Sequence, residues 1–545
     1  MSVMDIRQMV KRKINILWLF LAGLYLSLCT LSAQSEKTGW ESYEYVYGSN
    51  PWLQSSNAAG LQSLTIPDIS TAETFFNKKN GKLVNYYESD NSLAYGAEAR
   101  SLYRLNPKVV FFGEVRYTGF EGKNMGGSAF IDPYKNPFDL VEYADSTRGE
   151  KRRESYNLVG AFSAEVYKGI IFGAKLDYAA ANYAKRRDLR HENKEMDLTA
   201  AAGVASRLTP FLSAGVNYSY RRRTEEIRFD MYGNTDQQFN TLIDFGAFYG
   251  QQERFSDNDG YTKGNAKTPL FEEFHGVSLQ LDFTITPEWS FYNELGMQGR
   301  DGYYGKRGTT SIVYDEHDSK ILEYRGNLSF RKQNALHAFS LNLRREQLAN
   351  YENSYRKETQ ASGNTIIKYI GQTQMLDQTL WNIKGEYTAY LGIEEENPRW
   401  VLNAFAGYQE RKQTVSLYPN YRKQDIHQIH LDVSASRNLI RGNNQYSCFL
   451  GIGYLSGGGN EKQDGKYDSS QSQTSPASLD RYLYREYEYW TTDRVRGDVG
   501  FCYSRLLRDR MKGYARLDYA LTEAFSTDYI GKTFNELTLT IGVGF

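Results

Sequence analysis

The sequence predicts an all-β protein: a closed, antiparallel transmembrane β-barrel of about eighteen strands, with sixteen or fourteen as alternatives. Three observations predict this fold class. Many segments alternate apolar and polar residues, aromatic residues make up 14% of the 545 residues, and short turns alternate with long polar stretches. Outer-membrane barrels combine these features because alternate side chains face lipid and lumen, and because aromatic girdles mark both membrane interfaces.

The beginning of the chain is expected to be a signal peptide, residues 1–33. A basic stretch (residues 7–13) precedes a short apolar run (residues 14–28), and small residues before a cleavage position end at Ala33. The apolar run is shorter than the ~20 residues that a membrane-spanning helix needs. Its removal leaves 61 Lys and Arg against 64 Asp and Glu. This balance lacks the basic excess of a nucleic-acid-binding protein, so no nucleic-acid partner is expected.

Residues 34–67 are expected to form a periplasmic, plug-like segment rather than a strand. They carry several Trp and Tyr side chains, which are too apolar to trail freely in water, and the strand count is already even without them. We expect this segment to pack inside the barrel near its periplasmic mouth, with Asn57 hydrogen-bonding lumen-facing groups. An ordinary N-terminal linker is the alternative. The residues assigned to this plug and its turn are Trp52, Ser56, Asn57, Ala59 and Gly60.

Residues 68–545 are assigned to the barrel. Val277, Leu279 and Leu281 alternate with polar residues, as expected for a strand with one face toward lipid. Eight short Pro, Gly or Asn turns define sixteen strands, and strands near 68–78 and 532–545 bring the number to eighteen; the turns lie near residues 106–108, 168–169, 209–210, 286–287, 333–334, 397–398, 442–444 and 508–510.

The connections between these hairpins are expected to be long extracellular loops. Barrels of the outer membrane have short periplasmic turns and longer extracellular loops, which places the C-terminus in the periplasm. The stretches predicted as loops are residues 121–153, 223–274, 300–318, 351–377 and 458–492.

The last ten residues, ELTLTIGVGF, alternate strictly and end on Phe545. An apolar strand end in water would be an exposed edge that invites aggregation, so we expect this strand to close the barrel against the first one, within the lipid bilayer of the outer membrane. The terminal Phe545 resembles the signal that the barrel-assembly machinery reads, which makes that machinery an expected partner.

The chain also resembles a known family. The segment from Pro51 to Leu64, PWLQSSNAAGLQSL, together with Phe545, is similar to outer-membrane β-barrel proteins of Bacteroidota that form a family of unknown function. The stretch SNAAGL (residues 56–61) resembles the Asn-Pro-Ala-Gly-Leu element of the long-chain fatty-acid transporter superfamily, where it belongs to a hatch that plugs the lumen. Here Ala58 stands in place of the proline, and the predicted strand number is higher than is typical of that superfamily.

The predicted lumen face carries charges of both signs. Opposite charges on neighbouring strands can form cross-strand ion pairs, or they can line a polar permeation path. A mixed-sign wall argues against a strongly ion-selective pore, which would use a ring of one sign. The lumen charges selected as candidates are Arg100, Glu114, Arg116, Glu323 and Arg325.

No catalytic, metal or cofactor motif was found. His427 and His430 are the only close histidine pair, and their odd spacing places them on opposite faces of a strand. No enzymatic activity and no cofactor are therefore expected.

Three functions remain. The first is a plugged channel or transporter for an unidentified solute. The second is a surface interaction or assembly barrel that partners a secretion or uptake system, such as a surface lipoprotein. The third and weakest is an outer-membrane hydrolase.

Overall fold

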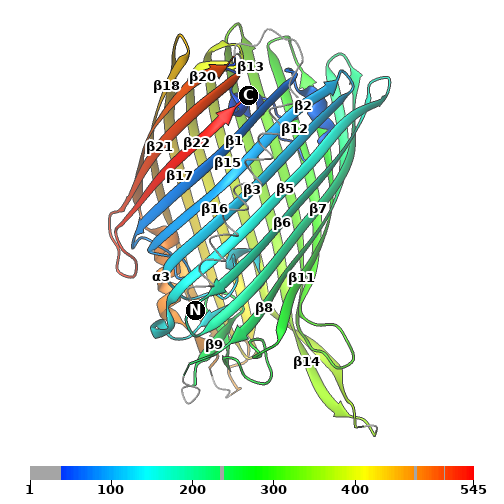
Figure 1. Ribbon diagram of the computed structural model, residues 1–545. Coiled ribbons are helices and arrows are strands. Elements are labelled where there is room, and N and C mark those ends of the chain that lie inside the picture. The colour runs from blue at the N-terminus through cyan, green and yellow to red at the C-terminus, as the bar shows by residue number, and fades with distance from the viewer. Residues whose placement is uncertain (1–38, 234–237, 362, 472–474, 509) are drawn as a thin grey trace, which may run out of the picture. The chain divides into compact units, whose positions relative to one another are not determined.

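Eighteen strands form a closed barrel in the residues that the computed structural model describes, 39–233, 238–361, 363–471, 475–508 and 510–545 (Figure 1). The predicted number is therefore confirmed. Neighbours in the barrel are consecutive antiparallel strands: β1 (Asp68–Gly81), β2 (Asn91–Asn106), β3 (Val109–Met125), β5 (Gly149–Tyr167), β6 (Ile170–Lys185), β7 (Arg190–Thr209), β8 (Leu212–Asp230), β11 (Lys267–Thr284), β12 (Trp289–Gly305), β13 (Val313–Lys332), β14 (Ala335–Thr359), β15 (Thr365–Glu394), β16 (Asn397–Leu417), β17 (Asn420–Arg441), β18 (Asn444–Lys466), β20 (Arg494–Arg508), β21 (Met511–Ala524) and β22 (Thr533–Gly544).

The first and last strands close the barrel. β1 pairs with β22 from Thr71 opposite Gly544 to Gly81 opposite Phe534. Next to the first of these pairs, Ser70 and Phe545 exchange two backbone hydrogen bonds of 2.8 and 3.0 Å. A closed ladder leaves no edge in hydrocarbon, where an unpaired backbone group would cost several kcal/mol, roughly.

The outer face of the barrel is apolar. Val277 and Leu279 of β11 are 56% and 48% exposed, whereas Ser278 between them points inward, toward Ser56. Comparable exposed residues occur on β17, β18 and β22. In water such a belt would be unfavourable, so it marks a barrel embedded in the outer-membrane bilayer. No helix of the described residues is long and apolar enough to cross a membrane.

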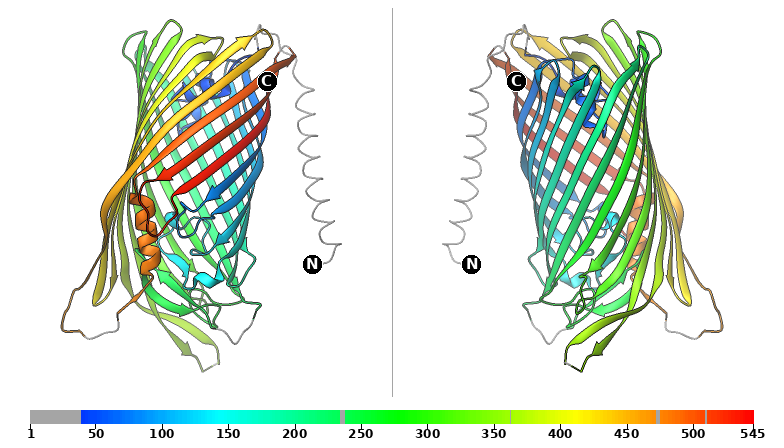
Figure 2. Two further views of the ribbon diagram at one scale, coloured as in Figure 1. Left: turned by 90° about the vertical axis from the view of Figure 1, so that its left-hand side faces the viewer. Right: turned by 90° about the vertical axis from the view of Figure 1, so that its right-hand side faces the viewer.

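The two ends of the barrel differ. All eight predicted turns join strands at one end, here called the turn end, where the C-terminus also lies (Figure 1). The opposite end, the loop end, is uneven: β22 has 12 residues and β1 has 14, whereas β14 has 25 and β15 has 30. Figure 2 shows that the wall is shorter at the loop end on the side of β20–β22, and that the hairpin of β14 and β15 protrudes from this end.

Several predicted loop boundaries are wrong. The connection from β12 to β13 is only residues 306–312, and that from β14 to β15 is only residues 360–364. Two connections at the loop end are short, since two residues separate β16 from β17 and four separate β6 from β7. A segment with polar residues at every position reads as a loop in the sequence. Where a strand extends beyond the membrane, however, both of its faces meet water, so such a segment can still be a strand.

The longer connections fold into a loop cap, which comprises the described parts of residues 126–148, 231–266 and 467–493. It contains a four-stranded sheet in the order β19 (Ala477–Ser478), β10 (Tyr249–Arg254), β9 (Asn240–Asp244) and β4 (Asp139–Glu142). Helix α3 (Asp480–Thr491) packs against β17 and β18. Short 3-10 turns, η2 (Pro133–Lys135) and η3 (Asp145–Thr147), complete the cap.

Candidate functional site

The N-terminal segment, residues 39–67, lies inside the barrel at the turn end (Figure 2). It contains helix α2 (Tyr43–Gly48) and the 3-10 helix η1 (Ala58–Ser63). The Ser42 hydroxyl caps α2 by accepting a hydrogen bond from the Tyr45 amide, and the Asn57 carbonyl oxygen Oδ1 caps η1 by accepting from the Ala59 amide at 3.0 Å. Of the aromatic side chains of this segment, Trp40, Tyr43, Tyr45 and Trp52 are buried and Tyr47 is half-buried.

Asn57 inserts its side chain into the wall between β7 and β8. Its amide nitrogen Nδ2 lies 3.1 Å from the Val204 carbonyl, 3.2 Å from the Val216 carbonyl and 3.0 Å from Gln280 Oε1. The residue is 1% exposed. An amide buried to this degree must make its hydrogen bonds, because a lone buried polar group is costly. Asn57 therefore fixes the segment to three neighbouring strands.

Three wall glycines make room for this turn. A Cβ atom added at Gly203 would lie 2.4 Å from Asn57 Oδ1, and one at Gly215 would lie 3.0 Å from Asn57 Nδ2. At Gly173 it would lie 2.0 Å from the backbone nitrogen of Ala59. These glycines were not selected from the sequence; the small residues at 200–203 were the available signal.

Trp52 and Ser56 extend this attachment along the wall to β11 and β12. The indole nitrogen of Trp52 donates to Asp282 of β11 at 2.9 Å, and the Ser56 amide donates to Glu294 of β12 at 3.2 Å. The Trp52 ring also meets the Tyr292 ring edge to face, with centroids 5.2 Å apart. At Gly60 a Cβ would approach the Trp52 carbonyl to 2.3 Å, so only glycine fits there.

The lumen charges selected from sequence divide between segment and wall. Arg325 donates to the Gln54 carbonyl at 2.6 Å, and Arg100 lies over the Tyr43 ring at 4.6 Å, so both contact the segment. The others form pairs within the wall. Glu98 pairs with Arg100 on its own strand and with Arg116 on β3. Glu323 pairs with Arg344 across β13 and β14, and Glu114 lies opposite Arg100 in the register of β2 and β3.

The segment reaches around the lumen. It contacts β2 through Arg104, whose Nη2 donates to the Leu64 carbonyl at 2.6 Å, and β21 through Lys512, which donates to the Glu41 carbonyl at 2.6 Å. Arg331 of β13 donates to the Tyr45 hydroxyl at 3.2 Å. β2 and β21 are separated only by β1 and β22, but β13 lies far from both in the barrel order. The segment therefore bridges the lumen rather than lining one side.

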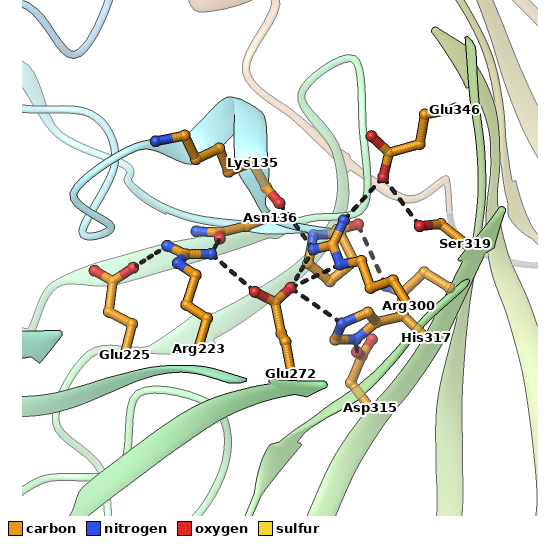
Figure 3. A network of polar contacts seen from close by, with 12 residues as sticks. Lys135, Asn136, Arg223, Glu225, Glu272, Arg300, Asp315, His317, Ser319 and Glu346 are labelled. Atoms are coloured by element: carbon orange, nitrogen blue, oxygen red, sulfur yellow. Dashed lines mark hydrogen bonds and ion pairs between the residues drawn. The ribbon is translucent and has the colours of Figure 1, made fainter. Parts of the chain in front are cut away.

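The loop cap lies at the other end of the barrel, and Figure 3 shows the polar network that attaches it to the wall. Arg223 of β8 donates to Asn136 at 2.7 Å, and Arg300 of β12 donates to the Lys135 carbonyl at 2.8 Å. Glu272 of β11 accepts from both arginines, at 3.0 Å from Arg223 Nη1 and 2.9 Å from Arg300 Nε. These charged side chains are at most 5% exposed.

Further buried contacts tie the wall to the network and to the cap. Glu225 accepts from the Ile131 amide at 2.9 Å, and Glu346 accepts from Arg300 and Ser319. His317 Nε2 lies 3.3 Å from Glu272 Oε1. A buried charge without its partner is strongly destabilising, by about 3–5 kcal/mol, so the cap position and the wall charges depend on each other.

Two more ion pairs hold other parts of the cap. Lys185 of β6 and Glu142 of β4 lie 2.6 Å apart, as do Arg411 of β16 and Glu486 of α3. Within the cap, burial raises the pKa of Asp139 to about 6 and that of Asp244 to about 7. Asp244 accepts from the amides of Gly246 and Tyr249, which stabilises the turn between β9 and β10.

A metal site is not among these features: in the described residues no group of three or more His, Cys, Asp or Glu side chains has a suitable arrangement. What the geometry provides is a lumen with a bound segment near one end and a folded cap near the other. Such an arrangement can control the passage or binding of a solute.

Comparison with known proteins identifies the family of the chain. A family model described as a family of unknown function (DUF6850) matches residues 58–545, and the chain belongs to that family. No curated protein matches the chain.

Several solved barrels resemble it at low identity. The ferric preacinetobactin receptor BauA from Acinetobacter baumannii is 9% identical, with a TM-score of 0.35, over 87% of this chain and 80% of that one. The outer-membrane transporter YddB from Escherichia coli is 8% identical, with a TM-score of 0.39, over 87% and 81%. A FadL homologue from Pseudomonas aeruginosa is 10% identical, with a TM-score of 0.29, over 94% and 99%.

Proposed function

We propose that this member of the DUF6850 family is a plugged channel or transporter for a small solute, in the outer membrane of a Bacteroidota cell. The observation that carries the proposal is the N-terminal segment bridging the lumen through Trp52, Asn57 and Arg325. A barrel of this size encloses more space than its own side chains fill, so it needs a plug if it is not to leak. The proposed role is not enzymatic.

The proposal includes an orientation. We infer that the turn end and the carboxylate of Phe545 face the periplasm and that the loop cap faces outward, since barrels of this class keep their short turns inside. A cysteine introduced at Ser354 in the long hairpin should react with an impermeant maleimide on intact cells. A cysteine at Lys168, in a turn, should react only after the outer membrane is opened; the reverse pattern would contradict the orientation.

Conductance in planar bilayers tests the function. Purified wild-type protein should be nearly silent, because the N-terminal segment is bound. A variant lacking residues 34–67 should give stable single-channel openings, with heat-modifiable migration and circular dichroism as checks that the barrel has formed. Equal conductance of both proteins, or silence of both, would contradict the proposal.

A second function, binding of a surface partner, is favoured by the hairpin of β14 and β15. β13 pairs with β14 only as far as Glu352, and β16 pairs with β15 only from Leu376 onward. Residues 353–375 therefore extend beyond the neighbouring strands (Figure 1). Ile370 on this hairpin is 63% exposed. Replacing residues 354–368 by a short turn should abolish copurification of a stoichiometric partner, such as a surface lipoprotein, and leave conductance unchanged. If no partner copurifies with the intact chain, this second function fails.

A further inference from the structure

A cavity of about 520 Å³ lies near the loop end of the lumen, beneath the connection between β1 and β2. Residues 83–89 of that connection and Tyr489 of α3 cover it, and lumen-facing side chains of the wall form its sides. The N-terminal segment does not contribute to its lining. The volume falls in the range of pockets that hold small organic molecules, about 300–1,000 Å³.

Two arginines in this cavity form no ion pair with a carboxylate of the described residues. Arg153 of β5 lies over the Phe120 ring at 5.9 Å, and its Nε atom is buried without a hydrogen-bond partner. Arg494 of β20 lies over the Tyr489 ring at 4.8 Å and donates to the Tyr489 carbonyl at 3.0 Å. No carboxylate of the described residues lies within ion-pair distance of either guanidinium.

The other charges of the cavity are balanced. Lys79 pairs with Glu536 at 3.2 Å, and Arg496 pairs with Asp498 at 2.8 Å. The remaining carboxylate in the lining, Glu88, accepts from the Asn85 amide at 2.8 Å, and its burial raises its pKa; it is near enough to Arg494 to act on it electrostatically but forms no ion pair with it. The cavity thus has a surplus of positive charge, which Arg153 and Arg494 provide.

Aromatic rings accompany that charge. Tyr87, Phe120, Tyr183 and Phe534 line the cavity together with Tyr489. Ring faces bind flat ligand groups by stacking, and guanidinium groups form paired hydrogen bonds with carboxylates. Desolvated guanidinium groups without an anion are unfavourable, so a ligand that supplies one would gain affinity from both features.

We propose that this cavity binds a small organic anion whose charged group is carried on a ring, with Arg153 and Arg494 contacting the charge and the aromatic side chains contacting the ring. The inference deepens the proposed function, on which it rests, by naming the class of solute. Two sources share this chemistry, an aromatic carboxylate and an acidic sugar, and the experiment separates them.

Isothermal titration calorimetry on the purified full-length protein tests the site. The probes are 4-hydroxybenzoate and galacturonate, each compared with its neutral counterpart, 4-hydroxybenzyl alcohol or galactose. At least one anion should bind, with an affinity at least tenfold higher than that of its neutral counterpart, and the tighter anion identifies the source. Arg153→Gln and Arg494→Gln should each weaken that binding at least tenfold, whereas Arg153→Lys should retain part of it.

Arg152→Gln is the matched control. Arg152 is the adjacent residue on β5, points to the other face and pairs with Glu121 and Glu150, so its loss should leave binding unchanged. The inference is overturned if neither anion binds, if the neutral compounds bind equally well, or if the Arg153 and Arg494 variants bind like wild type while folded by circular dichroism. If the anion binds but the variant lacking residues 34–67 does not conduct, the anion site is retained and the channel function is rejected. If that variant conducts but no anion binds, the channel function is retained and the anion site is rejected.

Discussion

The hydroxyl oxygens of Ser56 and Ser278 lie 2.9 Å apart, one on the N-terminal segment and the other on β11 of the wall. The two side chains thus point toward each other, and two sulfur atoms in the place of these oxygens would need to approach by only about 0.9 Å to reach the S–S bond length of about 2.05 Å. In a background with Cys448→Ser and Cys502→Ser, the pair Ser56→Cys and Ser278→Cys should therefore crosslink on oxidation. Trp52→Ala removes the hydrogen bond to Asp282, so this variant should give channel openings in bilayers. The crosslink should silence the Trp52→Ala channel, and reduction of the disulfide should restore its openings.

The chain offers a matched control for this crosslink. Ser290 and Ser329 also have their hydroxyl oxygens 2.9 Å apart, but both belong to the wall. The pair Ser290→Cys and Ser329→Cys should crosslink without silencing the Trp52→Ala channel. Equal silencing by both pairs would mean that the crosslink acts on the barrel, and the segment would then not be the gate.

Gly173→Ala should loosen the plug. Its Cβ would lie 2.0 Å from the Ala59 backbone nitrogen, which cannot rotate away as a side chain could. The turn must then leave its position, with the loss of the Asn57 hydrogen bonds, and we expect a several-fold increase in open probability. Gly160→Ala on the neighbouring strand is the control, since nothing lies within 4 Å of its added Cβ. If Gly173→Ala and Gly160→Ala have the same open probability, the contact between Gly173 and Ala59 does not hold the segment in place.

The loop cap should be more stable in mild acid than in mild alkali. Burial raises the pKa of Asp244 to about 7, with the nearby Asp139 and Glu486 acting in the same direction. The folded cap therefore holds a proton that the opened cap releases, so cap stability falls as the pH rises from about 4 to about 7. One such proton changes the opening equilibrium by up to roughly tenfold per pH unit.

Hydrogen exchange of residues 238–266 at pH 5 and pH 8, corrected for intrinsic rates, measures this effect. Asp244→Asn should flatten the dependence, because its side-chain oxygen can still accept from the amides of Gly246 and Tyr249. The Asp68→Asn variant, which alters a carboxylate outside the cap, should behave like wild type. A wild-type cap with the same protection at both pH values would contradict the prediction.

Deleting Phe545 should reduce insertion into the outer membrane when the assembly machinery is limiting. The residue also completes the closing pair of strands through its two backbone hydrogen bonds with Ser70. Phe545→Ser keeps the backbone hydrogen bonds but lacks the ring. If the deletion and Phe545→Ser both insert poorly, the assembly machinery recognises the aromatic ring. Normal insertion of both proteins under limiting machinery would reject the role.

The wall was predictable from sequence because its signals are local. Alternation and turn residues define hairpins, and lipid on one side of Leu279 or Leu537 enforces the period of two. The cap was not predictable, because its contacts join distant parts of the chain. Arg223 and Glu272 were placed in a predicted loop, yet they are buried in strands, where they pair with each other and Arg223 also donates to the side chain of Asn136 in the cap.

The candidate site was likewise predictable where its signals are local and not where it depends on distant parts of the chain. The composition of residues 34–67 indicates a segment that needs a partner surface, and the small turn at Asn57 indicates a tight contact. The register that brings Gly173, Gly203 and Gly215 together is set by β6, β7 and β8 as a sheet. No single strand carries that information.

The tether between the Asn57 turn and β1 has a consequence for closing. About ten residues join them, and an extended chain spans at most about 3.3–3.6 Å per residue, so a released turn stays within roughly 35 Å of its groove. One molecule confined to such a volume corresponds to a local concentration on the order of 10 mM. A competing ligand must exceed that advantage to keep the lumen open. When the ligand leaves, the turn rebinds in a unimolecular step, at a rate independent of how much protein the membrane contains.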